Sequence, residues 1–107
     1  MSDAIKSAGM TDARLFGMWE SDPRDASAIG QYGRVRLHFF ESGDLTYTIC
    51  SDAVRPSHRL TYSVDADTIT TQQRSSPREE QTKYAIEGYG RLAHTRDGIV
   101  SWYRRVI

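Results

Sequence analysis

The chain has 107 residues, of which 38% are hydrophobic and 26% are charged, a composition typical of one globular domain. Its 14 basic and 14 acidic side chains cancel, so no global charge favours binding to nucleic acid or to an anionic membrane. No apolar run approaches the ~18 residues of a membrane span, and the start lacks the basic and apolar regions of a signal peptide. The single cysteine, Cys50, cannot form an internal disulfide. We therefore expect a cytoplasmic protein with no nucleic-acid or membrane partner.

Beyond residue 12, polar and apolar residues alternate along most of the chain. Residues 1–12 are small and polar and predict a tail or a short helix, with Thr11 or Asp12 capping a turn into Leu15, whereas residues 13–107 predict the folded domain. Alternation rich in Thr, Tyr, Val and Ile is typical of strands with one buried face. The longer connections at 21–31 and 73–80, the second with a solvated Glu79–Glu80 pair, show no helical period and are expected to be loops. The pattern predicts eight strands, at 16–20, 34–39, 44–49, 59–64, 68–73, 83–87, 91–95 and 99–106.

The first predicted hairpin turns at residues 41–43. A three-residue loop there pairs Phe39 with Leu45, so that apolar side chains face each other across the ladder. Gly43 then takes the third loop position, where a type I turn followed by a bulge requires a positive φ.

Two later turns fix the register of the last strands. A three-residue loop at 88–90 would again place a glycine, Gly90, at the position of positive φ, and the Asp-Gly pair at 97–98 signals a two-residue type I′ turn. Counting from either turn places His94 on the inner face of the sheet, and the second places Trp102 on the outer face.

The predicted inner face is apolar but carries many hydrogen-bonding groups. Aliphatic side chains such as Ile99 share it with four tyrosines and a histidine, and each of these polar groups costs about 1–3 kcal/mol if it is buried without a partner. Either the polar groups satisfy one another in a filled interior, or they line a pocket for a small amphipathic or aromatic molecule. The candidate ligand-binding residues are Tyr47, Tyr62, Gln73, Tyr84, His94, Ser101 and Tyr103.

Three segments together carry a resemblance to a known family. Leu15–Glu20 contains a Gly-x-Trp, Leu37–Tyr47 is the alternating hairpin, and Tyr103–Arg105 places arginine two residues after an aromatic. The sequence thereby resembles the small bacterial lipocalin-like (calycin) proteins. The resemblance implies an all-β fold, an eight-stranded antiparallel up-and-down barrel preceded by a short N-terminal helix or tail.

The resemblance also implies a structural plug made of Gly17, Trp19 and Arg105, in which the arginine packs over the indole at one end of the barrel. Haem-binding calycins have a second glycine after Gly-x-Trp where this chain has Ser21, so we expect no cofactor.

The main functional hypothesis is non-catalytic binding of a small apolar, amphipathic or aromatic ligand. The first alternative is a protein-interaction module, a homodimer subunit or a toxin antidote, that uses Val100, Trp102 and Arg104 on the outer face. In the competing interpretation of that face, the N-terminal tail or the 21–31 loop folds over Trp102.

The second alternative is catalysis. His38 is expected outside and His94 inside, and no zinc-ligand spacing is present, so we expect no metal. Cys50 lies on the outer face and is interpreted as structural. His94 remains a weak candidate for acid–base chemistry with Tyr84 in a cyclase or isomerase. We expect the chain not to be an enzyme.

Overall fold

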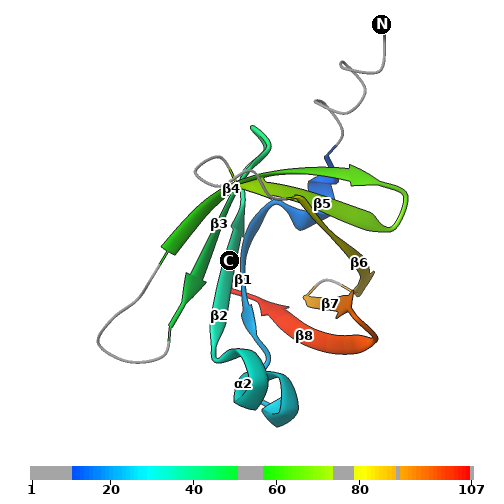
Figure 1. The fold of residues 1–107 in the computed structure, drawn as a ribbon. Coiled ribbons are helices and arrows are strands. Elements are labelled where there is room, and N and C mark those ends of the chain that lie inside the picture. Colours follow the sequence, from blue (N-terminus) through cyan, green and yellow to red (C-terminus); the bar gives the residue numbers. More distant parts are fainter. Residues whose placement is uncertain (1–10, 51–56, 74–78, 89, 107) are drawn as a thin grey trace, which may run out of the picture.

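The computed structural model describes residues 11–50, 57–73, 79–88 and 90–106, and these form a closed β-barrel. Each strand runs antiparallel to its neighbours in chain order, and the last closes on the first by pairing Arg105 with Trp19 (Figure 1). The predicted eight-stranded up-and-down barrel is therefore confirmed. The strands are β1 (Gly17–Ser21), β2 (Val35–Phe39), β3 (Asp44–Ile49), β4 (Ser57–Asp65), β5 (Thr68–Gln73), β6 (Glu79–Glu87), β7 (Arg91–Arg96) and β8 (Ile99–Arg105).

The hairpin register agrees with the prediction at each of the three turns. Phe39 pairs with Leu45, and His94 pairs with Tyr84 on β6 and with Ser101 on β8. Gly43 has a φ of +94°, as its loop position requires. Strand parity alone therefore assigned the faces of these strands.

One detail of the β6–β7 turn was predicted wrongly. The positive φ of this turn lies at Gly88, at +59°, and not at Gly90. The Gly90 carbonyl accepts a hydrogen bond of 2.9 Å from the Arg105 N–H, which continues the contact between this segment and β8. The positive φ therefore falls at the first position of the loop between the paired Glu87 and Arg91, and not at the third.

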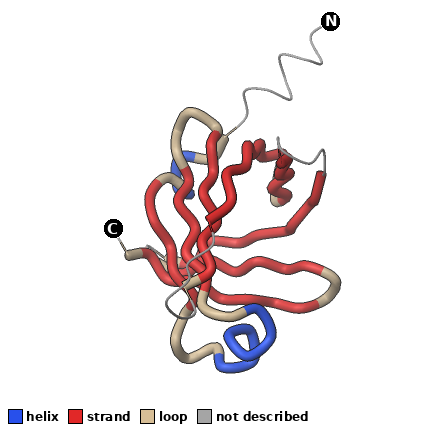
Figure 2. The backbone as a smooth tube through the Cα atoms, turned by 60° about the vertical axis from the view of Figure 1, so that its left-hand side comes forward, coloured by secondary structure: helices blue, strands red, loops and turns tan. Residues whose placement is uncertain are grey.

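Two short helices lie at opposite ends of the barrel, at the top and the bottom of Figures 1 and 2. At one end, the predicted turn into Leu15 is the 3₁₀ helix η1 (Ala13–Leu15), and Asp12 caps it by accepting a 3.0 Å hydrogen bond from the Arg14 N–H. Residues 1–10 of the predicted tail lie outside the described residues.

At the other end, the helix α2 (Ala26–Tyr32) occupies the segment that was predicted to be a loop, so that prediction was wrong. Seven residues are too few to display a helical period in the sequence. The helix depends instead on its ends. The Asp25 carboxylate accepts a 3.1 Å hydrogen bond from the Ala28 N–H, and the Gly33 N–H donates to the Ile29 carbonyl at 2.8 Å. Neither helix in the described part of the chain is long and apolar enough to cross a membrane.

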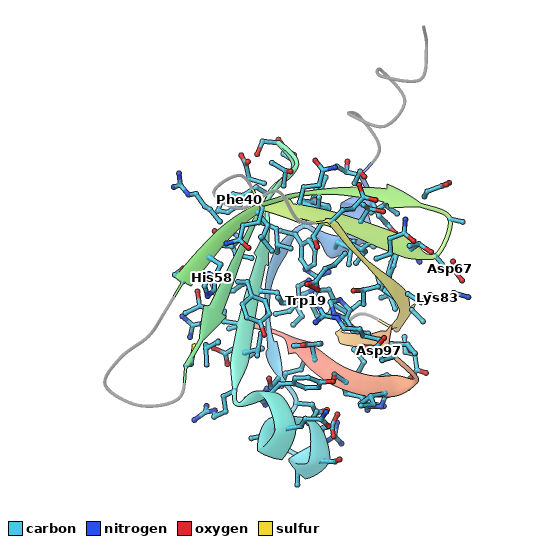
Figure 3. All side chains as sticks on the ribbon, in the orientation of Figure 1. Trp19, Phe40, His58, Asp67, Lys83 and Asp97 are labelled. Atoms are coloured by element: carbon cyan, nitrogen blue, oxygen red, sulfur yellow. The ribbon has the colours of Figure 1, made fainter. Side chains whose placement is uncertain are left out.

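The end of the barrel beside η1 is closed by aromatic and aliphatic packing. Leu15 and Trp19 are fully buried, and the indole N–H donates to the Leu15 carbonyl at 2.9 Å. The guanidinium carbon of Arg105 lies 4.3 Å from the centroid of the Trp19 ring, a cation–π contact worth roughly 0.5–2 kcal/mol. Arg105 also donates to the Phe16 carbonyl at 2.8 Å, which holds the start of β1 against β8. In Figure 3, Trp19 lies within the ring of strands.

The strands at the opposite end are longer than predicted. β4 begins at Ser57 and β6 at Glu79, so Glu79 and Glu80 belong to a strand and not to a loop. Ile99, which was expected inside, is 36% exposed, because it follows the β7–β8 turn at the end of the barrel. The pattern of alternation therefore placed the middle of each strand better than its ends.

Candidate functional site

The barrel encloses a cavity of about 260 Å³ that reaches the end beside α2. Its wall is formed by residues of α2 and of every strand except β1. A filled interior and a hollow one were both compatible with the sequence, and the structure is hollow at this end. The lining residues are Tyr32, Leu37, Phe39, Leu45, Tyr47, His58, Leu60, Ile69, Thr71, Gln73, Glu80, Thr82, His94, Arg96, Ser101 and Tyr103.

Most of the predicted ligand-binding residues meet at this cavity. The five that line it are Tyr47, Gln73, His94, Ser101 and Tyr103. The other two, Tyr62 and Tyr84, are buried but do not line it.

The hydroxyls of Tyr62 and Tyr84 have protein partners toward the closed end. The Tyr62 hydroxyl donates to the Phe40 carbonyl at 2.9 Å, and the Tyr84 hydroxyl donates to the Asp12 carboxylate at 2.7 Å. Burial raises the pKa of each phenol to about 12, and for Tyr84 the hydrogen bond to Asp12 adds to the effect. These two tyrosines are therefore structural, and Tyr84 secures the segment before β1 against the barrel.

His94 is the central polar group of the cavity wall. The residue is half-buried, but its Nε2 atom has no contact with solvent and no hydrogen-bond partner among the described residues. The Tyr103 ring lies beside it, with its centroid 5.0 Å from the centroid of the imidazole. Burial, and to a smaller extent the positive charge of Arg96, lowers the pKa of His94 from 6.5 to about 4. The imidazole is therefore neutral at pH 7.

Four lining residues were missed by the sequence reasoning, and they come from the ends of their elements. Glu80 and Arg96 form an ion pair of 3.1 Å, and His58 and Tyr32 also line the cavity. Three of them follow from parity: His58 lies two residues before the inward Leu60, Glu80 two before Thr82, and Arg96 two after His94. Extending the alternation by one further pair on β4, β6 and β7 would have found them. Figure 3 labels His58, near the start of β4.

The outer face of β8 is partly covered. Trp102 is half-buried, and the guanidinium carbon of Arg91 lies 4.2 Å from the centroid of its indole. The segment before α2 is attached to the Trp102 backbone: the Asp25 carboxylate accepts from its N–H at 3.0 Å, and the Asp22 N–H donates to its carbonyl at 2.9 Å. Val100 is 45% exposed and Arg104 is exposed. The 21–31 segment is therefore attached to the β8 backbone at Trp102, and the use of Val100, Trp102 and Arg104 as an interface stays a prediction.

The acid–base pair suggested by the sequence is not assembled at the cavity. Although Tyr84 and His94 are register partners, the Tyr84 hydroxyl is bonded to Asp12. Cys50 is half-buried outside the cavity lining, and its N–H donates to the Arg34 carbonyl at 2.7 Å. Within the described ranges, no three or more His, Cys, Asp or Glu side chains are grouped so as to hold a metal ion.

A closed eight-stranded barrel, plugged by tryptophan under arginine at one end and hollow at the other, defines a lipocalin-like β-barrel. Among solved structures, the fold is similar to the crystal structure of a lipocalin-like protein from Bacteroides uniformis ATCC 8492. The TM-score is 0.62, with 16% sequence identity over 87% of this chain and 99% of that one. At this identity the likeness concerns the fold alone. No protein-family model matches the chain, and no curated protein matches it.

Proposed function

We propose that this protein binds one small amphipathic or aromatic molecule, without catalysis, in the cavity at the α2 end of the barrel. The size of the cavity supports a single small ligand. Its volume of about 260 Å³ is roughly nine times the ~30 Å³ that a water molecule takes up in the liquid. It lies just below the usual range of ligand pockets, which begins near ~300 Å³.

The observation that carries the proposal is the buried, unpartnered Nε2 of His94, a residue that lines a mainly apolar cavity. Ligand sites typically combine apolar and aromatic walls with a few polar groups that orient the ligand. Here Leu37, Leu45 and Ile69 supply the apolar wall, and the imidazole supplies a polar group that no described residue satisfies. A ligand that bonds to Nε2 would recover the cost of burying it.

We place this function inside the cell, since the only cysteine cannot form an internal disulfide. The alternative of a dimer or toxin antidote docking on β8 now has less support, because Trp102 is partly covered by Arg91. Catalysis by His94 also has less support, because a base with a pKa near 4 is weak at pH 7 and Tyr84 does not reach the cavity.

The test is titration with N-phenyl-1-naphthylamine, an uncharged dye whose fluorescence rises in apolar sites. We expect a saturable rise for the native chain and its loss in Ser101→Phe, because Ser101 is 8% exposed and lines the cavity, so that a phenyl ring there would fill much of the space. The matched control is Val100→Phe, the same change one residue away on the outer face, where the side chain is 45% exposed.

Thermal unfolding of each variant would verify that it is folded. The proposal fails if the native chain gives no saturable signal, or if folded Ser101→Phe binds the dye as tightly as Val100→Phe.

A further inference from the structure

The polar groups of the cavity divide into an outer charged set and an inner uncharged set. The charged side chains, Glu80 and Arg96, lie near the ends of β6 and β7 and neutralise each other across 3.1 Å. Further along the same strand faces, Thr82 and His94 are uncharged, as is Ser101, the partner of His94 on β8. The arginine whose charge acts on the imidazole is therefore already paired with a carboxylate.

This distribution of charge selects against an ionic ligand. A carboxylate or ammonium group beside His94 would lose its hydration and gain no counter-ion, because Arg96 is already paired with Glu80. The ligand group that reaches the imidazole is thus expected to be polar but uncharged.

The chemistry of a neutral imidazole narrows the choice further. Nε2 donates a hydrogen bond if it carries the ring proton and accepts one if Nδ1 carries it. A carbonyl oxygen can only accept, so it suits one tautomer, whereas a hydroxyl group donates and accepts and suits both. A hydroxyl group therefore satisfies Nε2 whichever tautomer is present.

The rest of the wall suits a ring system. The cavity is lined by the aromatic rings of Tyr47 and Tyr103, and the Tyr103 ring is also the aromatic neighbour of His94. Tyr47 lies on β3 and Tyr103 on β8, which are three strands apart around the closed barrel, so aromatic side chains face the cavity from more than one side. Aromatic side chains favour stacked or edge-on contact with an aromatic ligand.

On these grounds, and resting on the proposed function, we infer that the ligand is an uncharged aromatic compound that carries a hydroxyl group, and that this hydroxyl bonds to Nε2 of His94. The cavity would then prefer such a ligand over an analogue that lacks the hydroxyl. The analogue would bind more weakly, because it leaves the buried nitrogen without a hydrogen bond.

The inference is tested with two probes of nearly equal shape, 2-naphthol and 2-methylnaphthalene, each used to displace N-phenyl-1-naphthylamine. We expect 2-naphthol to displace the dye at about tenfold lower concentration, which corresponds to ~1.4 kcal/mol for one satisfied group. Equal displacement by the two probes would overturn the inference while leaving the proposed function intact. Absence of dye binding would instead refute the proposed function itself.

Variants assign the preference to one residue. His94→Leu should abolish the tenfold preference, and His94→Gln should retain most of it, since an amide side chain of similar reach can still donate and accept. The matched control is His38→Leu, the same substitution at a histidine that does not line the cavity, and it should keep the preference. Persistence of the preference in His94→Leu, or its loss in His38→Leu, would contradict the assignment. If His94→Leu does not fold, His94→Phe takes its place, since a phenyl ring also lacks the hydrogen-bonding nitrogen and should likewise abolish the preference.

A third probe tests the charge argument. 2-Naphthoate has the same ring system with an ionised carboxylate at pH 7, and we expect it to bind at least tenfold more weakly than 2-naphthol. Binding as tight as that of 2-naphthol would show that the cavity accepts an anion and would refute the restriction to uncharged ligands.

Discussion

The buried imidazole of His94 predicts that the protein loses stability in mild acid. The folded-state pKa of about 4 lies below the ordinary value of 6.5. Below pH 6.5 the unfolded chain therefore binds a proton at this residue that the folded chain does not bind. This proton binding lowers the free energy of the unfolded state relative to the folded state. The two pKa values, 6.5 unfolded and about 4 folded, differ by an amount that is converted to free energy at ~1.36 kcal/mol per pH unit. The free energy of unfolding is therefore expected to fall by about 3 kcal/mol between neutral pH and pH 4.

The pH window separates this effect from the carboxylates. The pKa values of Asp12 and Asp22 are lowered to about 2, in each case chiefly by a hydrogen bond from an arginine two residues later. A carboxyl group with a lowered folded-state pKa stabilises the fold above its ordinary value of 3.8, and this contribution is lost as the pH falls from there toward 2. Between pH 6.5 and 4.5 the dependence on these two groups is therefore small.

The assay is urea unfolding at pH 7.0, 6.0, 5.0 and 4.5, with the unfolding free energy extrapolated to water. The native chain should lose most of the ~3 kcal/mol over this range. His94→Gln, which cannot be protonated, should show a nearly flat profile. The matched control, His58→Gln, changes an exposed histidine and should keep the slope of the native chain.

Two results would refute the reasoning. A native profile that is flat from pH 7.0 to 4.5 would mean that residue 94 takes up its proton as easily folded as unfolded. An unchanged slope in His94→Gln would mean that another group causes the loss.

Three further predictions concern the plug, the α2 attachment and two glycines, and all are measured by urea unfolding at pH 7. Trp19→Phe should destabilise the barrel by about 2–3 kcal/mol, because it removes the indole hydrogen bond and weakens the arginine stacking; an unchanged midpoint would show that the plug is not needed. Asp25→Ala should lower the free energy of unfolding by about 1–2 kcal/mol and speed hydrogen exchange of the Trp102 amide, since the Asp25 carboxylate accepts hydrogen bonds both from the α2 N-terminus and from β8. Unchanged, slow exchange at Trp102 in the variant would contradict this attachment. Gly98→Ala should destabilise the fold by about 1–2 kcal/mol, because alanine is strained at the φ of +78°. Gly30→Ala should stabilise it by about 0.5–1 kcal/mol, because alanine is the better helix former and its Cβ enters open space within α2. A change of stability in the same direction for both variants would contradict these reasons.

The sequence by itself determined the strands and their faces. A side-chain period of two is a local property of a strand, and Gly43 and the Asp-Gly turn at 97–98 fixed how neighbouring strands align. That was sufficient to predict the inward direction of His94 and the outward direction of Trp102, whereas the closed barrel was predicted from the family resemblance that rests on Gly17, Trp19 and Arg105.

Contacts between distant segments decided the rest. Whether an inward tyrosine lines the cavity depends on its height in the barrel and on its partner, and the partner of Tyr84 is Asp12, 72 residues away. Likewise, the attachment of α2 depends on Asp25 reaching the Trp102 N–H across 77 residues of sequence.

The cavity itself could not be predicted, because its volume is the small difference between the space inside the ring of strands and the side chains that fill it. Alternation specifies which side chains point inward, and it does not specify how closely they pack. Only the tertiary structure could therefore show that the barrel is packed around Trp19 and hollow beside His94.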